Sequence, residues 1–264
     1  MDVIETTGLT KRYGETVAVD GLELSIPKGT IYGFLGPNGA GKTTTMRLLT
    51  SLTRPTSGHG TVAGVSITNR SALRSHVGYL PETPPLYERA TALEQLEYVA
   101  GLHDLPLEPA RERIDSLLVA LNLADDADVR INEFSTGMRQ KVAFIQAVLH
   151  EPDVVFLDEP TSGLDPRAAK TIRERLCALA NAGTTVFLST HILSVVEAVA
   201  DIVGILSDGH LVAEGTPEVL AQRADTGADA TLEDVFLELT EAETPRSTSN
   251  AVGLDTENTE MIHD

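Results

Sequence analysis

Short apolar runs recur along this chain and alternate with stretches in which apolar residues keep helical spacing. Continuous runs of this length are typical of strands that are buried on both faces of a parallel sheet. The expected strands cover residues 31–35, 77–80, 154–157, 184–189 and 202–207. The expected helices that alternate with them cover residues 44–52, 166–180 and 192–199. This alternation predicts an α/β fold with a mostly parallel sheet and covering helices.

Two regions of the first 150 residues have other patterns. Residues 1–30 predict short strands with turns, and residues 60–67 predict another strand. From about residue 86 the pattern is helical, and Thr91 with Glu94 forms a capping-box start. The expected helices cover residues 91–102, 108–121 and 136–150. Because no strand is expected between the first two, residues 86–150 are predicted to form a small helical subdomain inserted into the α/β core.

The C-terminal part predicts smaller elements. Residues 211–213 suggest a short edge strand, and Thr216-Pro217-Glu218 starts a helix with proline at its first position. Residues 231–239 form an amphipathic helical pattern. Beyond Thr240 the chain is rich in Ser, Thr, Asn and Glu, a composition that favours disorder. We therefore expect one domain over residues 1–240 and an acidic, disordered tail over residues 241–264.

A glycine-rich loop joins the strand at 31–35 to the helix that follows. It matches Gly-x-x-x-x-Gly-Lys-[Ser/Thr], and its strand–loop–helix setting separates a phosphate cradle from a glycine-rich turn with a solvated lysine. Glycines allow successive backbone N–H groups to point at one anion, and the helix N-terminus adds its positive end. Lys42 would reach the β- and γ-phosphates, and Thr43 would offer a hydroxyl to Mg²⁺. The candidate residues are Gly36, Pro37, Asn38, Gly39, Ala40, Gly41, Lys42, Thr43 and Thr44.

Two adjacent carboxylates, Asp158 and Glu159, close the apolar run at 154–157. Ligands of open α/β sheets lie at the carboxyl ends of the strands, which is the edge where the glycine loop is expected. Adjacent carboxylates point in different directions, so one can serve the Mg²⁺ shell while the other addresses water. A solvated acidic turn is the alternative, and the apolar strand before the pair argues against it. The sequence thus predicts binding of a nucleoside triphosphate with Mg²⁺.

The charge of the chain excludes some partners. The formal net charge is −19, from 39 acidic and 20 basic residues. Nonspecific nucleic-acid binding depends mainly on Lys and Arg at phosphates, so this composition opposes it. So acidic a surface also repels itself at low salt, a feature associated with halophiles. We hypothesise that the protein works in a high-salt cytoplasm and unfolds in dilute buffer but not in molar KCl.

Cysteine, signal and membrane patterns point to a soluble, intracellular protein. The single cysteine, Cys177, rules out an intrachain disulfide framework and lies in an apolar helical stretch, where a small buried hydrophobe is expected. The N-terminus has no basic region followed by an apolar core, so no secretory signal is expected. The most apolar region, residues 185–206, is interrupted by His191, Glu197 and Asp201, which fits strand–helix–strand better than a membrane span. The histidines form no metal-ligand cluster.

Several motifs, in this order and spacing, together resemble the nucleotide-binding subunit of ATP-binding cassette (ABC) transporters. They are the glycine loop, Phe134-Ser135-Thr136-Gly137-Met138-Arg139-Gln140, the strand with Asp158-Glu159, Ser162-Gly163-Leu164-Asp165, and His191 after its strand. The resemblance covers about residues 3–240. It implies a P-loop NTPase (ABC ATPase) core with a mostly parallel sheet, an N-terminal antiparallel β subdomain and the inserted helical subdomain. Tyr79-Leu80-Pro81-Glu82, the Ser-Thr-Gly-Met signature and Leu232 to Phe236 resemble the drug-export or ABC-2-type branch.

The resemblance assigns roles to single residues. Tyr13, which by itself reads as an ordinary half-exposed tyrosine in a loop, would stack on adenine. Asp158 and Thr43 would hold Mg²⁺, and Glu159 would polarise the attacking water. His191, which by itself reads as a core histidine, would touch the γ-phosphate.

Two residues depart from the family pattern. Glu82 stands where many members carry glutamine, in the loop that senses Mg²⁺ and contacts the membrane partner, so a carboxylate there is expected to alter the grip on the metal. Glutamate also occurs in the export branch. Thr136 occupies a position that is commonly glycine, and its side chain would narrow the approach to the γ-phosphate. Its role is therefore less defined than those of its neighbours Ser135 and Gly137.

Ser135, Thr136 and Gly137 open a helix and so form a second anion site. One chain has no second phosphate loop to pair with it, and in the resembled family this segment completes the site of a second subunit, with ATP between the two. The resemblance thus implies an ATPase, working as a homodimer with ATP and Mg²⁺, that drives a separate transmembrane permease. It would be cytoplasmic and peripheral on the inner face of the membrane through that permease.

Two rival functions remain open. A soluble ABC-type ATPase acting on nucleic acid or ribosomes would usually need a second cassette, a coiled-coil insertion or basic arms, and the sequence shows none of these. A nucleotide-binding switch without turnover is opposed by the presence of Glu159, His191 and Ser135. The transported substrate is not encoded in this chain, and export is favoured by the subtype resemblance alone.

Overall fold

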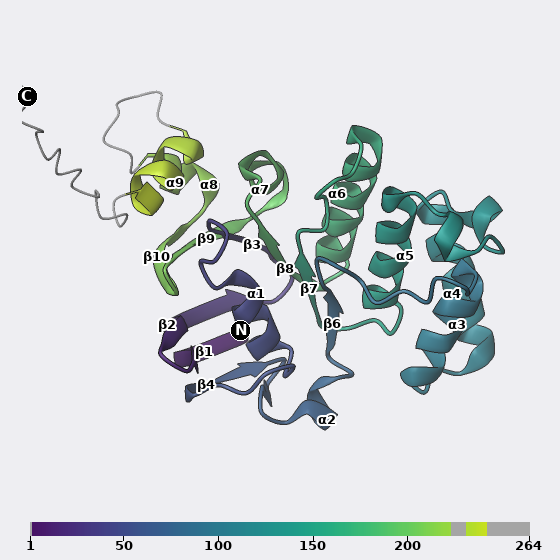
Figure 1. Ribbon diagram of the computed structural model, residues 1–264, viewed down its shortest axis with the longest axis horizontal. Coiled ribbons are helices and arrows are strands. Elements are labelled where there is room, and N and C mark those ends of the chain that lie inside the picture. Colours follow the sequence, from purple (N-terminus) through teal and green to yellow (C-terminus); the bar gives the residue numbers. More distant parts are fainter. Residues whose placement is uncertain (1, 223–230, 242–264) are drawn as a thin grey trace, which may run out of the picture.

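The computed structural model describes residues 2–222 and 231–241, which form two sheets and the helices around them (Figure 1). The predicted disordered tail, residues 241–264, lies outside the described residues except for Glu241, which ends the last helix. The division of the chain into a domain and a tail stays a prediction. No helix within the described ranges is long and apolar enough to cross a membrane.

The first sheet is antiparallel and has the order β2-β1-β4-β5. Its strands are β1 (Asp2–Tyr13), β2 (Thr16–Pro27), β4 (Ser57–Val62) and β5 (Val65–Ser66). The prediction of short strands over residues 1–30 was wrong, because β1 and β2 are each 12 residues long. Register shifts such as that between Thr6 and Leu9 break the alternating pattern that would have revealed them. The single strand expected over residues 60–67 is two strands joined by a turn at Ala63 and Gly64, both at positive φ.

The second sheet has six strands in the order β10-β9-β3-β8-β7-β6. All neighbouring pairs are parallel except β10 with β9, so the predicted mostly parallel sheet is confirmed. The strands are β3 (Ile31–Leu35), β6 (Val77–Leu80), β7 (Val154–Asp158), β8 (Thr185–Thr190), β9 (Ile202–Ser207) and β10 (His210–Gly215). The carboxyl ends of β3, β7 and β8 lie side by side, which places the glycine loop, Asp158 and Thr190 at one edge.

Both faces of this sheet are buried. In β7, Val154 and Phe156 pack towards α1 and the antiparallel sheet, whereas Val155 and Leu157 pack towards the helices on the opposite face. This is why the strands read as continuous apolar runs. The side chain of Asp158, one residue on from Leu157, returns to the face of α1.

Apart from α2, a single turn for which no helix was predicted, the helices agree with the predicted ranges to within a few residues. They are α1 (Lys42–Leu49), α2 (Arg70–Leu73), α3 (Ala92–Leu102), α4 (Leu107–Ala120), α5 (Thr136–Val148), α6 (Pro166–Asn181), α7 (Leu193–Val199), α8 (Pro217–Ala221) and α9 (Leu232–Glu241), with short 3₁₀ turns at Ala124–Asp126 and Ile131–Glu133. The capping box at the start of α3 is confirmed, since Thr91 Oγ1 accepts from Glu94 N and Glu94 Oε2 accepts from Thr91 N. Helix α1 ends earlier than predicted because Ser51 takes φ 59°.

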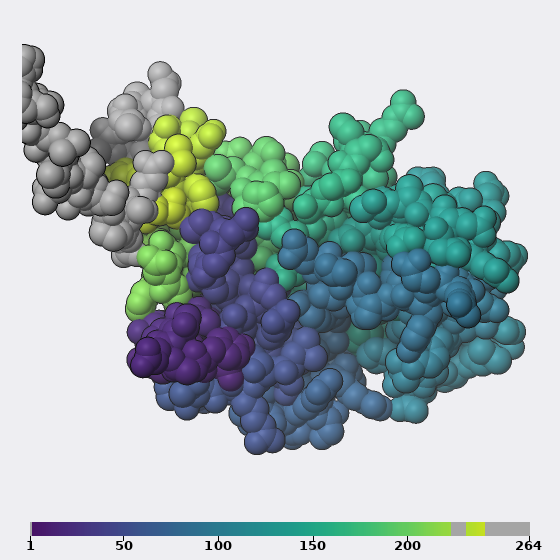
Figure 2. Space-filling view, in the orientation of Figure 1, coloured from purple at the N-terminus to yellow at the C-terminus, as the bar shows by residue number. Residues whose placement is uncertain are grey.

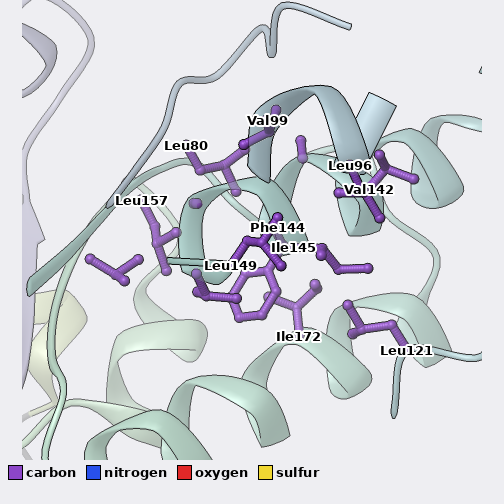
Figure 3. Packing of buried hydrophobic residues seen from close by; sticks show 14 of the residues in the cluster. Leu80, Leu96, Val99, Leu121, Val142, Phe144, Ile145, Leu149, Leu157 and Ile172 are labelled. Atoms are coloured by element: carbon purple, nitrogen blue, oxygen red, sulfur yellow. The ribbon is translucent and has the colours of Figure 1, made fainter. Parts of the chain in front are cut away.

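Helices α3, α4 and α5 lie between β6 and β7 in the chain and form the lobe at the right of Figure 1. Their core is continuous with one face of the large sheet. In Figure 3, Phe144 of α5 lies near the centre of this cluster, whose members include Leu157 of β7 and Ile172 of α6. In the space-filling view, the purple N-terminal strands lie at the lower left and the teal helical lobe at the right (Figure 2). The phosphate loop lies between these two ends of the molecule.

Candidate nucleotide-binding site

The glycine loop runs from β3 into α1 and is enclosed by backbone from two other strands. A Cβ atom on Gly41, which has φ 107°, would lie 2.2 Å from the carbonyl oxygen of Ala18 in β2. A Cβ atom on Gly36 would lie 2.5 Å from the carbonyl oxygen of Leu206 in β9. The Gly209 N–H, in the turn after β9, donates to the Ala40 carbonyl at 3.0 Å. The loop is therefore fixed by close backbone approach that only glycine permits at these two positions.

Lys42 is the first residue of α1, and its buried side chain reaches back to the start of the loop. Its Nζ donates to the carbonyl oxygens of Gly36 at 2.6 Å and Pro37 at 3.0 Å. Burial lowers the pKa of this amine, and the negative charges of Glu159, Asp158 and Glu82 oppose that shift. The ammonium group thus contacts two carbonyl oxygens, and Lys42 shares one hollow with the three carboxylates.

Thr43 and Asp158 connect the loop to the sheet. The Thr43 hydroxyl donates to Asp158 Oδ2 at 2.8 Å, and Asp158 is 2% exposed. A hydroxyl and a carboxylate fit Mg²⁺, which is usually held by one or two carboxylates together with phosphate oxygens and water. The described residues contain no group of three or more His, Cys, Asp or Glu that could hold a metal by themselves.

Glu159 has an unusual backbone, and its side chain makes several hydrogen bonds. Its φ is 50°, a value that a residue with a Cβ atom rarely adopts, and its amide donates to the Ser189 carbonyl. Its carboxylate accepts from the Thr190 hydroxyl at 2.9 Å and from the His191 amide at 2.9 Å. His191 Nδ1 lies 2.7 Å from the same carboxylate. Because an ionised carboxylate only accepts, Nδ1 carries the proton in this contact.

These groups line one hollow of about 360 Å³. Its lining consists of Ala18, Asn38, Gly39, Gly41, Lys42, Thr43, Thr44, Glu82, Asp158, Glu159 and His191. All of these except Ala18 were predicted from the sequence. Ala18 belongs to β2 and approaches Gly41 through its backbone carbonyl. Because its side chain plays no part in that contact, no pattern of residue types could have predicted it. The structure also brings Glu82, two residues after the end of β6, into the same hollow.

Other predicted residues lie outside the hollow. Gly36, Pro37 and Ala40 form the back of the loop, where Gly36 and Pro37 accept from Lys42. Tyr13, expected in a loop, ends β1 next to a two-residue turn; it is 49% exposed, and Lys11 Nζ lies 4.9 Å from its ring centroid.

The signature segment begins α5. Ser135 is its N-cap, with its Oγ accepting from Met138 N at 3.3 Å, and Ser135 and Thr136 are both exposed. Thr136 lines a neighbouring hollow together with Glu82 and Glu159, while Gly137 lies in the first turn of α5. The segment therefore lies beside the site of its own chain without entering it.

A glycine loop at a helix N-terminus, with a hydroxyl on the helix and two carboxylates on the next strand but one, defines a P-loop nucleotide-binding protein. The ABC transporter family profile matches residues 19–162. Among curated relatives, daunorubicin resistance ATP-binding protein DrrA3 of Streptomyces coeruleorubidus is 40% identical over 227 residues, covering 86% of this chain and 71% of its own. Bacitracin transport ATP-binding protein BcrA of Enterococcus faecalis is 41% identical over 214 residues, covering 80% of this chain and 68% of its own.

The fold agrees with that relationship. The solved structure of an ATP-binding subunit of an ABC transporter superposes with a TM-score of 0.83 at 31% identity, covering 90% of this chain and 99% of that one. The chain belongs to the ABC transporter ATP-binding family, and ATP hydrolysis is the activity of that family. The predicted fold class, with its antiparallel β subdomain, mostly parallel sheet and helices, is confirmed.

Proposed function

We propose that this chain hydrolyses ATP with Asp158 and Thr43 as protein ligands of Mg²⁺ and Glu159 as the base for the attacking water. The observation that carries the proposal is the Thr43–Asp158 hydrogen bond, which joins the phosphate loop to the strand end where Glu159 follows. Lys42 and the loop N–H groups would bind the phosphates, and Tyr13 would stack on the adenine. A bound Mg²⁺ would supply charge neutralisation on the β- and γ-phosphates.

The negative charge of Glu82 acts to raise the pKa of Lys42, and Glu82 lines the same hollow. We propose that it also helps to hold the metal, because Asp158 and Glu82 together make two carboxylates, which is what Mg²⁺ usually takes from protein at most. His191 is held by Glu159 at Nδ1, so its Nε2 is the ring atom free to face the γ-phosphate.

The site is proposed to be completed by a second copy of the chain. Ser135 and Thr136 stand exposed at the N-terminus of the 13-residue helix α5, a position that suits an anion. Within the described residues the chain offers one phosphate loop, which already has its own strand and helix. ATP between two chains would meet the loop of one and the Ser135–Gly137 segment of the other.

A separate membrane permease is proposed to dock on the helical lobe. A hollow of about 710 Å³ lies between the loop after β6 and helices α3 and α5, and its lining is mainly apolar. Tyr87, Tyr98 and Leu102 are 58%, 49% and 54% exposed there, and the two tyrosine rings pack edge to face at 5.4 Å. An exposed aromatic pair of this kind suits a protein partner. The daunorubicin resistance and the bacitracin transport named for the two relatives support export across the membrane, with this chain peripheral on its inner face.

Steady-state hydrolysis tests the proposed chemistry. Glu159→Gln keeps the shape of the side chain but removes the base, so turnover should fall by roughly 10²–10⁴-fold while ATP binding persists. Thr43→Val should instead weaken Mg²⁺ binding, so the Mg²⁺ concentration that gives the half-maximal rate should rise. Wild-type turnover by Glu159→Gln would refute the role of Glu159, and an unchanged Mg²⁺ response in Thr43→Val would refute that of Thr43.

The docking surface has a separate test. Tyr87→Ala and Leu102→Ala should reduce stimulation of hydrolysis by the permease without changing the rate of the isolated chain. Val119→Ala is the matched control, since Val119 is 64% exposed on α4 and does not line the hollow. Equal loss of stimulation in all three variants would refute this surface.

A further inference from the structure

Strand β8 ends at Thr190, whose side chain is completely buried next to the candidate base. Its hydroxyl oxygen accepts from the Ile192 amide at 3.1 Å, a local turn of the kind that Ser and Thr often make with the residue two positions on. The same hydroxyl lies 2.9 Å from Glu159 Oε2. Since a carboxylate only accepts, the hydroxyl proton points to Glu159. The Ile192 amide occupies an acceptor site on the hydroxyl oxygen, and the hydroxyl proton is donated to Glu159.

The hydrogen bonds of Glu159 are unequally divided between its two oxygens. Oε1 receives the His191 amide and His191 Nδ1, whereas in the described part of the chain Oε2 receives Thr190 alone. Each carboxylate oxygen offers about two lone-pair sites. Oε1 is thus saturated, and one lone pair remains on Oε2. This is the atom that is able to accept a proton from water.

We propose that Thr190 is a positioning residue for hydrolysis, holding Glu159 Oε2 so that its remaining lone pair faces the attacking water. The inference rests on the proposed role of Glu159 as the base. Thr190 does not line the hollow, whereas Glu159 does, so Thr190 acts through the carboxylate. The positive φ of Glu159 makes such support necessary, because a strained backbone persists only where its surroundings determine it.

Thr190→Val tests this role, since valine keeps the branched shape and removes the hydroxyl. We expect kcat to fall of the order of tenfold, the scale of losing one hydrogen bond to a charged group, with KM for ATP and ATP affinity by equilibrium dialysis within twofold of wild type. Thr190→Ser restores the donor and should recover most of kcat. Thr6→Val is the matched control: Thr6 is buried and its hydroxyl donates to the Leu22 carbonyl at 2.8 Å in the antiparallel sheet, so its loss should leave kcat unchanged.

A double variant separates this inference from the proposed function. If Thr190 acts through Glu159, Thr190→Val should add no further loss to the residual turnover of Glu159→Gln. Wild-type kcat in Thr190→Val, equal losses in the valine and serine variants, or a raised KM at constant kcat would overturn the inference. Should the valine variant not fold, Thr190→Ala carries the same expectation. Full turnover by Glu159→Gln alone would instead overturn the base itself.

Discussion

Two glycines of the phosphate loop provide a matched pair for testing how β2 holds the site. Gly39 has φ 86° and Gly41 has φ 107°, so alanine is strained at both positions. A Cβ atom on Gly39 would meet nothing within 4 Å, whereas one on Gly41 would lie 2.2 Å from the carbonyl oxygen of Ala18. Restoring ordinary contact at Gly41 requires a backbone shift of about 1 Å. Both substitutions therefore carry the cost of a strained backbone, and only Gly41→Ala adds a steric clash with Ala18.

Two costs determine the difference in stability between Gly39→Ala and Gly41→Ala. A side chain in a left-handed conformation costs about 1–2 kcal/mol, which applies to both variants. Overpacking adds typically 1–3 kcal/mol, which applies to Gly41→Ala alone. For a chain of this size, that added term lowers Tm by roughly 2–12 °C relative to Gly39→Ala. Because the shift also displaces the loop N–H groups, Gly41→Ala should bind ATP at least about tenfold more weakly than wild type.

Thermal unfolding of the two variants, followed by circular dichroism, and ATP binding by equilibrium dialysis measure these effects. Equal Tm values for the two variants would show that the contact with Ala18 does not restrict the residue at position 41. Wild-type ATP affinity in Gly41→Ala would contradict the claim that β2 fixes the loop.

Three further predictions concern adenine binding, salt and pH. Tyr13→Ala should weaken ATP binding by ~1–3 kcal/mol, measured by equilibrium dialysis, whereas Tyr13→Phe should bind ATP like wild type. Wild-type ATP affinity in Tyr13→Ala would refute stacking. With a net charge of −19, the protein should unfold in dilute buffer and fold cooperatively in molar KCl, and a salt-independent Tm would contradict this. Burial, together with the positive charge of His103, lowers the pKa of His150 from 6.5 to about 4. The unfolded chain therefore binds a proton at His150 at higher pH than the folded chain does, so the free energy of unfolding should fall as pH drops from about 6.5 towards 4. His150→Asn should flatten that part of the stability–pH curve, whereas His59→Asn, at an exposed histidine, should leave it unchanged.

The sequence predicted the large sheet well because its strands are buried on both faces. Runs such as 154–157 have no polar interruption, and the helices between them keep their periodicity. The antiparallel sheet was harder to predict, since bulges in β1 and β2 disturb the alternation and split two long strands into apparent fragments. Strand order was also beyond the sequence, because it depends on packing between residues far apart in the chain.

The candidate site divides in a similar way. Gly41, Lys42 and Asp158 were predicted because their chemistry appears in residue type and spacing. Ala18 and Thr190 were not, because each acts through a position that only the fold creates: a backbone carbonyl against a glycine, and a buried hydroxyl beside a carboxylate. The roles assigned to the predicted residues stay predictions.

The central claim is that ATP joins two chains, each completing the site of the other. The mass of Glu159→Gln in solution, measured by light scattering in molar KCl with and without ATP and Mg²⁺, tests it most directly. We predict a change from the 28.2 kDa monomer to twice that mass when nucleotide is added, and no change when Ser135→Ala and Gly137→Val are also present. If Glu159→Gln binds ATP and stays a monomer even beside its membrane partner, the claim is wrong.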